Sequence, residues 1–167
     1  VVAVNLSRRH FLDPDLVGDV QHILGDTGLP ASQLRLIVDE DALIDEQEHL
    51  DQIDIFHEMG VALGVARFGG CFTRLTQLRD LQLQAVKISA SYTGHHEGTA
   101  DPLGEHIVSS LVAGAHLLGM YVVAEDVATA EQAEWLRDLG VYAALGPFTG
   151  GLMSAMEIES MIVEGEL

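Results

Sequence analysis

The sequence has 167 residues and a formal net charge of −18, because 26 acidic residues face only 8 lysines and arginines. This length suits one domain with a sizeable core, and such an acidic surface excludes a nucleic-acid partner and contact with anionic membranes. The single cysteine, Cys71, excludes an intrachain disulfide framework. With no apolar run near the roughly 18 residues of a membrane helix, we expect a cytoplasmic domain, although its parent protein could be membrane-attached.

Six short apolar segments are predicted as strands, each leading toward a helix. They are Val2–Ser7, Leu34–Glu40, Val61–Arg67, Ala85–Ser89, Val122–Asp126 and Tyr142–Gly146. Alternation of strands and helices builds a parallel sheet, and in a barrel of such units the carboxyl ends of the strands meet at one mouth. We therefore expect the polar residues at these ends to gather in space: Asn5, Glu40, Lys87 and Glu125.

Capping residues mark the expected helix boundaries. Asp13 before Pro14 and Asp101 before Pro102 are typical helix starts, and capping boxes are predicted at Thr129 with Gln132 and at Ser154 with Glu157. Expected helix ends are Gly28, Gly60 and Gly119. One amphipathic helix is predicted over Glu46–Met59, and the weakest helix lies within Phe72–Asp80.

Five short strings occur in a characteristic order: VNLS, FGG after a strand, VKIS, VVAED and LGP. Together they resemble the EAL domain of bacterial cyclic di-GMP phosphodiesterases over essentially the whole chain. The resemblance implies an α/β fold, a TIM-like (β/α)8 barrel of which this chain supplies about six βα units. Residues 1–167 are therefore expected to be a partial EAL-like domain, with the N-terminal part of the barrel upstream or missing. Open sheet edges predict poor stability or self-association.

The resemblance also implies functions for the residues that match. Family members hydrolyse cyclic di-GMP with two divalent cations, Mg²⁺ or Mn²⁺. Asn5 and Glu125 match metal-binding positions, and Lys87 matches a lysine that orients the attacking water or the phosphate. Glu40 matches a glutamate that steadies a loop.

Several family positions are changed in this sequence. Five positions where the family has an acidic residue are occupied here by Ile37, Ala66, Arg67, Ser89 and Ala128. The family's late glutamine is replaced by Leu145. The name-giving glutamate has no counterpart in residues 1–167. With only Asn5 and Glu125 left as metal ligands, and a cation at Arg67, we expect no metal cofactor and no catalysis, Lys87 and Glu40 being remnants.

Each surviving residue also has a structural interpretation. Asn5 could be a turn residue, Glu125 could pair with Arg67, and Lys87 could be a leftover of ancestry. For Glu40, a solvated acid at a helix start is the favoured interpretation. The histidines His95, His96, His106 and His116 lack the spacing of metal ligands, and Cys71 lacks a neighbouring base for nucleophilic catalysis.

The leading hypothesis is a degenerate, non-catalytic EAL-like domain in bacterial cyclic di-GMP signalling, acting as a nucleotide sensor or a protein-interaction module. Ligand binding would involve Asn5, Arg67, Lys87 and Glu125, with Arg67 holding a phosphate in place of a metal. The alternatives are an interaction-only domain and an active phosphodiesterase. Expected partners are cyclic di-GMP and another protein or domain, such as a GGDEF-type domain in the parent chain.

Overall fold

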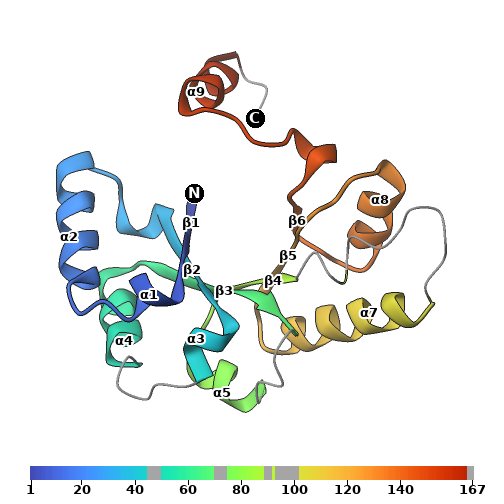
Figure 1. The fold of residues 1–167 in the computed structure, drawn as a ribbon, viewed down its shortest axis with the longest axis horizontal. Helices are drawn as coiled ribbons and strands as arrows, with labels where there is room; N and C mark the ends of the chain where they lie inside the picture. The colour runs from blue at the N-terminus through green and yellow to red at the C-terminus, as the bar shows by residue number, and fades with distance from the viewer. Residues whose placement is uncertain (45–49, 70–74, 89–91, 93–101, 165–167) are drawn as a thin grey trace.

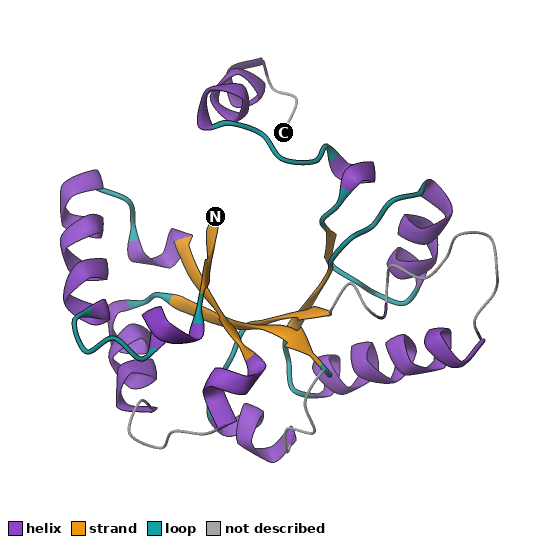
Figure 2. Cartoon of the chain, viewed as in Figure 1, coloured by secondary structure: helices purple, strands orange, loops and turns teal. Residues whose placement is uncertain are grey.

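The computed structural model describes residues 1–44, 50–69, 75–88, 92 and 102–164. All six predicted strands are present, as β1 (Val2–Leu6), β2 (Leu34–Asp39), β3 (Ala62–Phe68), β4 (Ala85–Ile88), β5 (Tyr121–Ala124) and β6 (Ala143–Ala144). They form one parallel sheet in the order β1-β2-β3-β4-β5-β6. The sheet curves into an open half-barrel with helices along its outer side (Figures 1 and 2).

The helices follow the strands in the expected alternation. They are α1 (Arg8–Phe11), α2 (Leu16–Thr27), α3 (Glu40–Ile44), α4 (Leu50–Met59), α5 (Leu75–Asp80), α7 (Pro102–Leu117), α8 (Ala130–Asp138) and α9 (Ala155–Glu164), with 3-10 turns at Ala31–Gln33 and Pro147–Thr149. The predicted beginnings of α4 and α5 fall partly outside the described residues. No helix within the described part of the chain is long and apolar enough to cross a membrane.

The two faces of the sheet have different compositions. The outer face packs against the helices through large apolar side chains, among them Leu36, Val65 and Val122, which belong to the main core. The strand register places Arg35 opposite Ala62, and Ala85 opposite both Gly64 and Tyr121, on the inner face. The inner face is therefore built largely from small residues, between which the longer polar side chains lie.

Capping explains where several helices begin and end. Gly28 ends α2 with a φ of 68°, a left-handed conformation that glycine adopts without strain. The start of α2 differs from the prediction: the helix begins at Leu16, and the Asp13 carboxylate instead accepts from the backbone N–H of Asp15 at 3.1 Å. The short helix α1, which the sequence analysis did not predict, precedes it.

The two predicted capping boxes differ in detail. Ser154 and Glu157 form the reciprocal pair, with the Glu157 N–H donating to Ser154 Oγ at 3.3 Å and the Ser154 N–H donating to Glu157 Oε2 at 2.6 Å. These hydrogen bonds from the Ser154 backbone and side chain lower the pKa of Glu157. Thr129 accepts from the Gln132 N–H at 3.2 Å, but the Gln132 side chain accepts from Ala128 instead of Thr129.

Replacing the Thr129 cap is expected to weaken α8. Thr129→Ala removes the acceptor of one otherwise unpaired helix N–H, and should lower the free energy of unfolding by about 1 kcal/mol. Urea denaturation followed by circular dichroism measures the change. The matched control is Ser110→Ala, an exposed hydroxyl that bonds within α7, for which we expect a change within about 0.5 kcal/mol. Equal losses in the two variants would contradict a capping role for Thr129.

Candidate functional site at the mouth of the half-barrel

Lys87 lies at the centre of the polar residues at the mouth. It comes from β4, and its side chain is only 9% exposed. Its ammonium donates to Asn5 Oδ1 at 3.2 Å and to Glu125 Oε1 at 3.1 Å. Asn5 belongs to β1 and Glu125 directly follows β5, so one side chain connects the first strand to the fifth. The predicted gathering of Asn5, Lys87 and Glu125 is confirmed.

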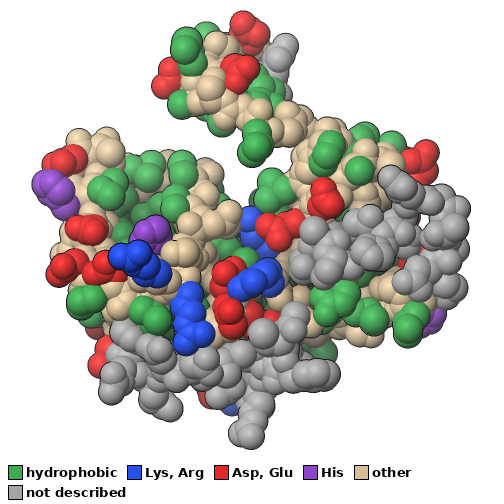
Figure 3. Space-filling model, in the orientation of Figure 1, with side chains coloured by type: hydrophobic (Ala, Val, Ile, Leu, Met, Phe, Trp, Pro, Cys, Tyr) green, Lys and Arg blue, Asp and Glu red, His purple; other side chains and the backbone are tan. Residues whose placement is uncertain are grey.

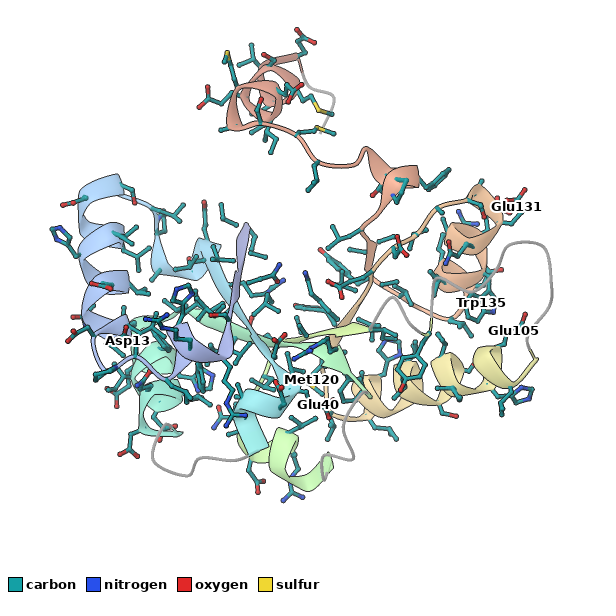
Figure 4. The ribbon with its side chains drawn as sticks, viewed as in Figure 1. Asp13, Glu40, Glu105, Met120, Glu131 and Trp135 are labelled. Carbon is teal, nitrogen blue, oxygen red and sulfur yellow. The ribbon has the colours of Figure 1, made fainter. Side chains whose placement is uncertain are left out.

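Glu40 is buried, which corrects the prediction of a solvated acid. It is the first residue of α3, at the end of β2 (Figure 4), and is only 2% exposed. Because α3 packs against β2 and β3, the start of the helix is covered by the protein. An acid at a helix start is usually solvated, so the sequence pattern favoured the wrong environment.

Arg67 pairs with two aspartates and not with Glu125, which corrects the alternative that joined Arg67 to Glu125. Its Nη2 lies 2.9 Å from Asp39 Oδ2 and 3.1 Å from Asp41 Oδ1. Asp39 on β2 lies opposite Ala66 on β3 in the strand register, so its carboxylate lies beside Arg67, the next residue of β3. Arg67 has a φ of 57°, which is uncommon for a residue with a side chain. The sequence analysis missed both aspartates, although they flank Glu40.

The backbone after β5 keeps a conformation that favours glycine. Asp126, the residue directly after Glu125, has a φ of 59°. Aspartate tolerates the left-handed region better than most residues, because its short polar side chain can bond locally. The loop that presents Glu125 is therefore compatible with an aspartate at position 126.

Apolar groups occupy two of the positions where acids were expected. Ile37 is 2% exposed, and its Cδ1 lies 2.8 Å from where a Cβ on Gly64 would be. Ala66 is also buried. Neither side chain can bind a cation. Leu145 is half-exposed, and Ser89 lies outside the described residues.

The oxygen donors of the mouth are few. Within the described residues, no group of three or more histidine, cysteine, aspartate or glutamate side chains is arranged to hold a metal ion. Around Lys87, Asn5 and Glu125 could offer oxygen atoms to one divalent cation, in competition with the Lys87 ammonium. His106 and His116 are exposed on α7, whereas Cys71, His95 and His96 lie outside the described residues.

Comparison with known proteins gives the family. A family profile described as "EAL domain" matches residues 1–151. The chain belongs to the EAL domain family. The resemblance inferred from the five short strings is therefore confirmed, as is the α/β barrel architecture with about six βα units.

The EAL relatives include named cyclic di-GMP proteins. The chain is 34% identical over 138 residues to "Cyclic di-GMP phosphodiesterase NbdA" of Pseudomonas aeruginosa, covering 82% of this chain and 17% of NbdA. The structure titled "PaMucR Phosphodiesterase, c-di-GMP complex" matches with a TM-score of 0.87 and 30% identity, covering 93% of this chain and 63% of that one. The chain therefore spans a minor part of NbdA and about two thirds of the PaMucR chain.

The comparisons contradict the expectation that no metal cofactor is involved. The structure titled "Klebsiella pneumoniae BlrP1 pH 9.0 manganese/cy-diGMP complex" is 27% identical with a TM-score of 0.74, covering 86% of this chain and 37% of that one. A related EAL structure thus holds manganese together with the nucleotide. The loss of several acids in this sequence was not sufficient reason to dismiss a cation.

Proposed function

We propose that this EAL domain binds cyclic di-GMP together with a divalent cation and does not hydrolyse it, so that it acts as a receptor in cyclic di-GMP signalling. The observation that carries the proposal is the position of Lys87. Its buried ammonium contacts both surviving metal-ligand positions, Asn5 and Glu125. The mouth therefore keeps a polar binding group while lacking carboxylates at Ile37 and Ala66.

The charge at the mouth favours binding of the nucleotide with a cation. The ion-paired groups of the mouth are two basic side chains, Lys87 and Arg67, and three carboxylates, those of Glu125, Asp39 and Asp41. The charges of these five groups sum to −1, whereas cyclic di-GMP carries two negative phosphodiesters. A divalent cation supplies positive charge that screens the ligand from these carboxylates. Asn5 and Glu125 would hold it, leaving the Lys87 ammonium to donate to a phosphate oxygen.

The absence of turnover follows from the number of donors. Activation of water by two metal ions requires a set of oxygen ligands around both ions. The described residues offer one amide and one carboxylate around Lys87, and Ile37 and Ala66 add none. A single weakly held cation can neutralise a phosphate without positioning a second ion for the attacking water.

The binding test uses labelled cyclic di-GMP in equilibrium dialysis with Mg²⁺, with Mn²⁺ and with EDTA. We expect binding with either cation that weakens at least tenfold in EDTA, and no comparable binding of GMP. Absence of cyclic di-GMP binding under all three conditions would leave an interaction-only domain and overturn the receptor function. Equal binding with cation and with EDTA would overturn the part of the proposal that concerns the cation.

Substitutions of Arg67 and Asp41 are predicted to change the affinity for cyclic di-GMP in opposite directions. Arg67→Ala removes a positive group and leaves the charges of Asp39 and Asp41 unpaired near a dianionic ligand. We expect cyclic di-GMP to bind about tenfold more weakly, which corresponds to about 1.4 kcal/mol. Asp41→Asn should strengthen binding, because it removes a negative charge. Isothermal titration calorimetry in Mg²⁺ measures both.

The control for these variants is Arg79→Ala. Arg79 is an exposed arginine on α5 that pairs with its neighbour Asp80. Its replacement changes the net charge equally, and we expect no change in affinity. If Arg67→Ala and Arg79→Ala weaken binding to the same extent, Arg67 has no local effect on the ligand.

A further inference from the structure

The carboxyl end of β3 carries an extra residue in the sheet. Val65 lies opposite Val86 of β4, whereas Phe68 lies opposite Ile88, so three steps along β3 are matched to two steps along β4. The additional residue falls between Val65 and Phe68, where Arg67 lies. Such a bulge bends its strand and changes the direction of the side chains that it carries. The register shift therefore sets the direction in which Arg67 leaves the sheet.

The backbone around this bulge is held in an uncommon conformation. Arg67 has a φ of 57° and Gly69 a φ of 86°, on either side of Phe68. The left-handed region costs little for glycine but is unfavourable for arginine. A residue stays in such a conformation only where its surroundings fix it, and these positions are concentrated at functional sites. Contacts around residues 67–69 must therefore hold the arginine in place.

The contacts that hold this segment come from three sides. Phe68 is buried in the main core. Gly69 lies against α7, where a Cβ on the glycine would be 2.7 Å from Leu111 Cδ2. From beyond β4, Tyr92 Oη donates to the Gly69 carbonyl oxygen at 2.7 Å. Because the Tyr92 ring itself packs against the main core, its hydroxyl is a fixed donor that ties the end of β3 to the chain after β4.

We propose that Tyr92 is a positioning residue, whose hydroxyl holds the bulge in the conformation that keeps the Arg67 guanidinium at the mouth. Arg67 pairs there with Asp39 and Asp41, and basic and acidic side chains lie together near the middle of the face that Figure 3 shows. Tyr92 acts through Arg67 and reaches it through the backbone of Gly69 and Phe68. Its effect on affinity rests on the proposed function, in which Arg67 strengthens the binding of cyclic di-GMP.

The binding arm of the test is a double-mutant cycle measured by isothermal titration calorimetry in Mg²⁺. Tyr92→Phe removes the hydroxyl and keeps the ring in the core. We expect cyclic di-GMP to bind about threefold more weakly, less than on removal of the guanidinium itself, and no further loss when Tyr92→Phe is added to Arg67→Ala. The control is Tyr142→Phe, at an exposed tyrosine beside β6, which should leave the affinity unchanged.

Two results of this cycle would overturn the proposal. The first is an unchanged affinity in Tyr92→Phe. The second is an equal loss from Tyr92→Phe with and without Arg67, because the hydroxyl would then act by a route that does not include the guanidinium.

The second arm needs no ligand. The side-chain N–H signal of Arg67 in a ¹H–¹⁵N spectrum is identified by its loss in Arg67→Ala. It should move in Tyr92→Phe and stay in place in Tyr142→Phe. A signal that does not move in Tyr92→Phe would overturn the positioning role, whether or not the nucleotide binds. A signal that moves, in a wild-type chain that binds no cyclic di-GMP, would support the link from Tyr92 to Arg67 and place the failure in the proposed function.

Discussion

Incubation of this chain with cyclic di-GMP and Mg²⁺ or Mn²⁺ is expected to release no linear dinucleotide above a heat-inactivated control. The two-metal pathway depends on oxygen ligands that hold both ions, and each ion contributes several kcal/mol to stabilising the transition state. Loss of that contribution slows the reaction by about a thousandfold or more. This chain lacks such ligands at three positions, because the buried side chains of Ile37 and Ala66 are apolar and Arg67 is a paired cation. Anion-exchange chromatography of the nucleotides after overnight incubation measures the product.

The positive control for this assay is the EAL domain of NbdA, the relative named as a cyclic di-GMP phosphodiesterase. Glu125→Ala identifies the source of any product from the present chain, because it removes the one carboxylate at a surviving metal-ligand position. Linear dinucleotide that accumulates with the wild type and disappears with Glu125→Ala would show an active enzyme. The non-hydrolytic part of the proposed function would then be wrong.

The strands could be predicted from the sequence because their burial leaves a simple pattern. β2 is apolar from Leu36 to Val38 and β3 from Ala62 to Ala66, and the two strands are bounded by Pro30 and the acids after Val38 in one case and by Gly60 and Gly69 in the other. Parallel strands covered on both faces have this composition. Helix α1 could not be found in the same way, because four residues are too few to show a helical period.

The sequence predicts which residues form the site, but not which of their charged side chains contact one another. Asn5, Lys87 and Glu125 follow from the rule that the carboxyl ends of parallel strands meet at one mouth. Which cation reaches Glu125 depends on side-chain direction: Lys87 points into the half-barrel from β4, whereas Arg67 turns at the end of β3 with its positive φ. A non-glycine residue in that conformation leaves no signal in the sequence, so the Arg67 contacts with Asp39 and Asp41 could not be foreseen.

Lys87→Met is expected to reduce the free energy of unfolding by about 3 kcal/mol. Removal of one partner of a buried ion pair leaves the other charge uncompensated, which typically destabilises a protein by about 3–5 kcal/mol. The lower end of that range applies because Glu125 is 28% exposed and keeps part of its hydration. Urea denaturation at fixed protein concentration measures the change, since association of copies would otherwise shift the transition.

Arg67→Met is the matched comparison, because it also removes one cation from two oxygen partners at the mouth. The Arg67 side chain is 54% exposed and its partners Asp39 and Asp41 are 32% and 43% exposed, so water replaces the lost contacts. Such surface pairs contribute about 1 kcal/mol or less. Adding Glu125→Gln to Lys87→Met should recover part of the lost stability, because it removes the carboxylate charge that has lost the Lys87 ammonium. If the two methionine variants lose equal stability, or the double variant recovers none, Lys87 does not neutralise Glu125 in the folded protein, and the arrangement of the mouth derived from these contacts is wrong.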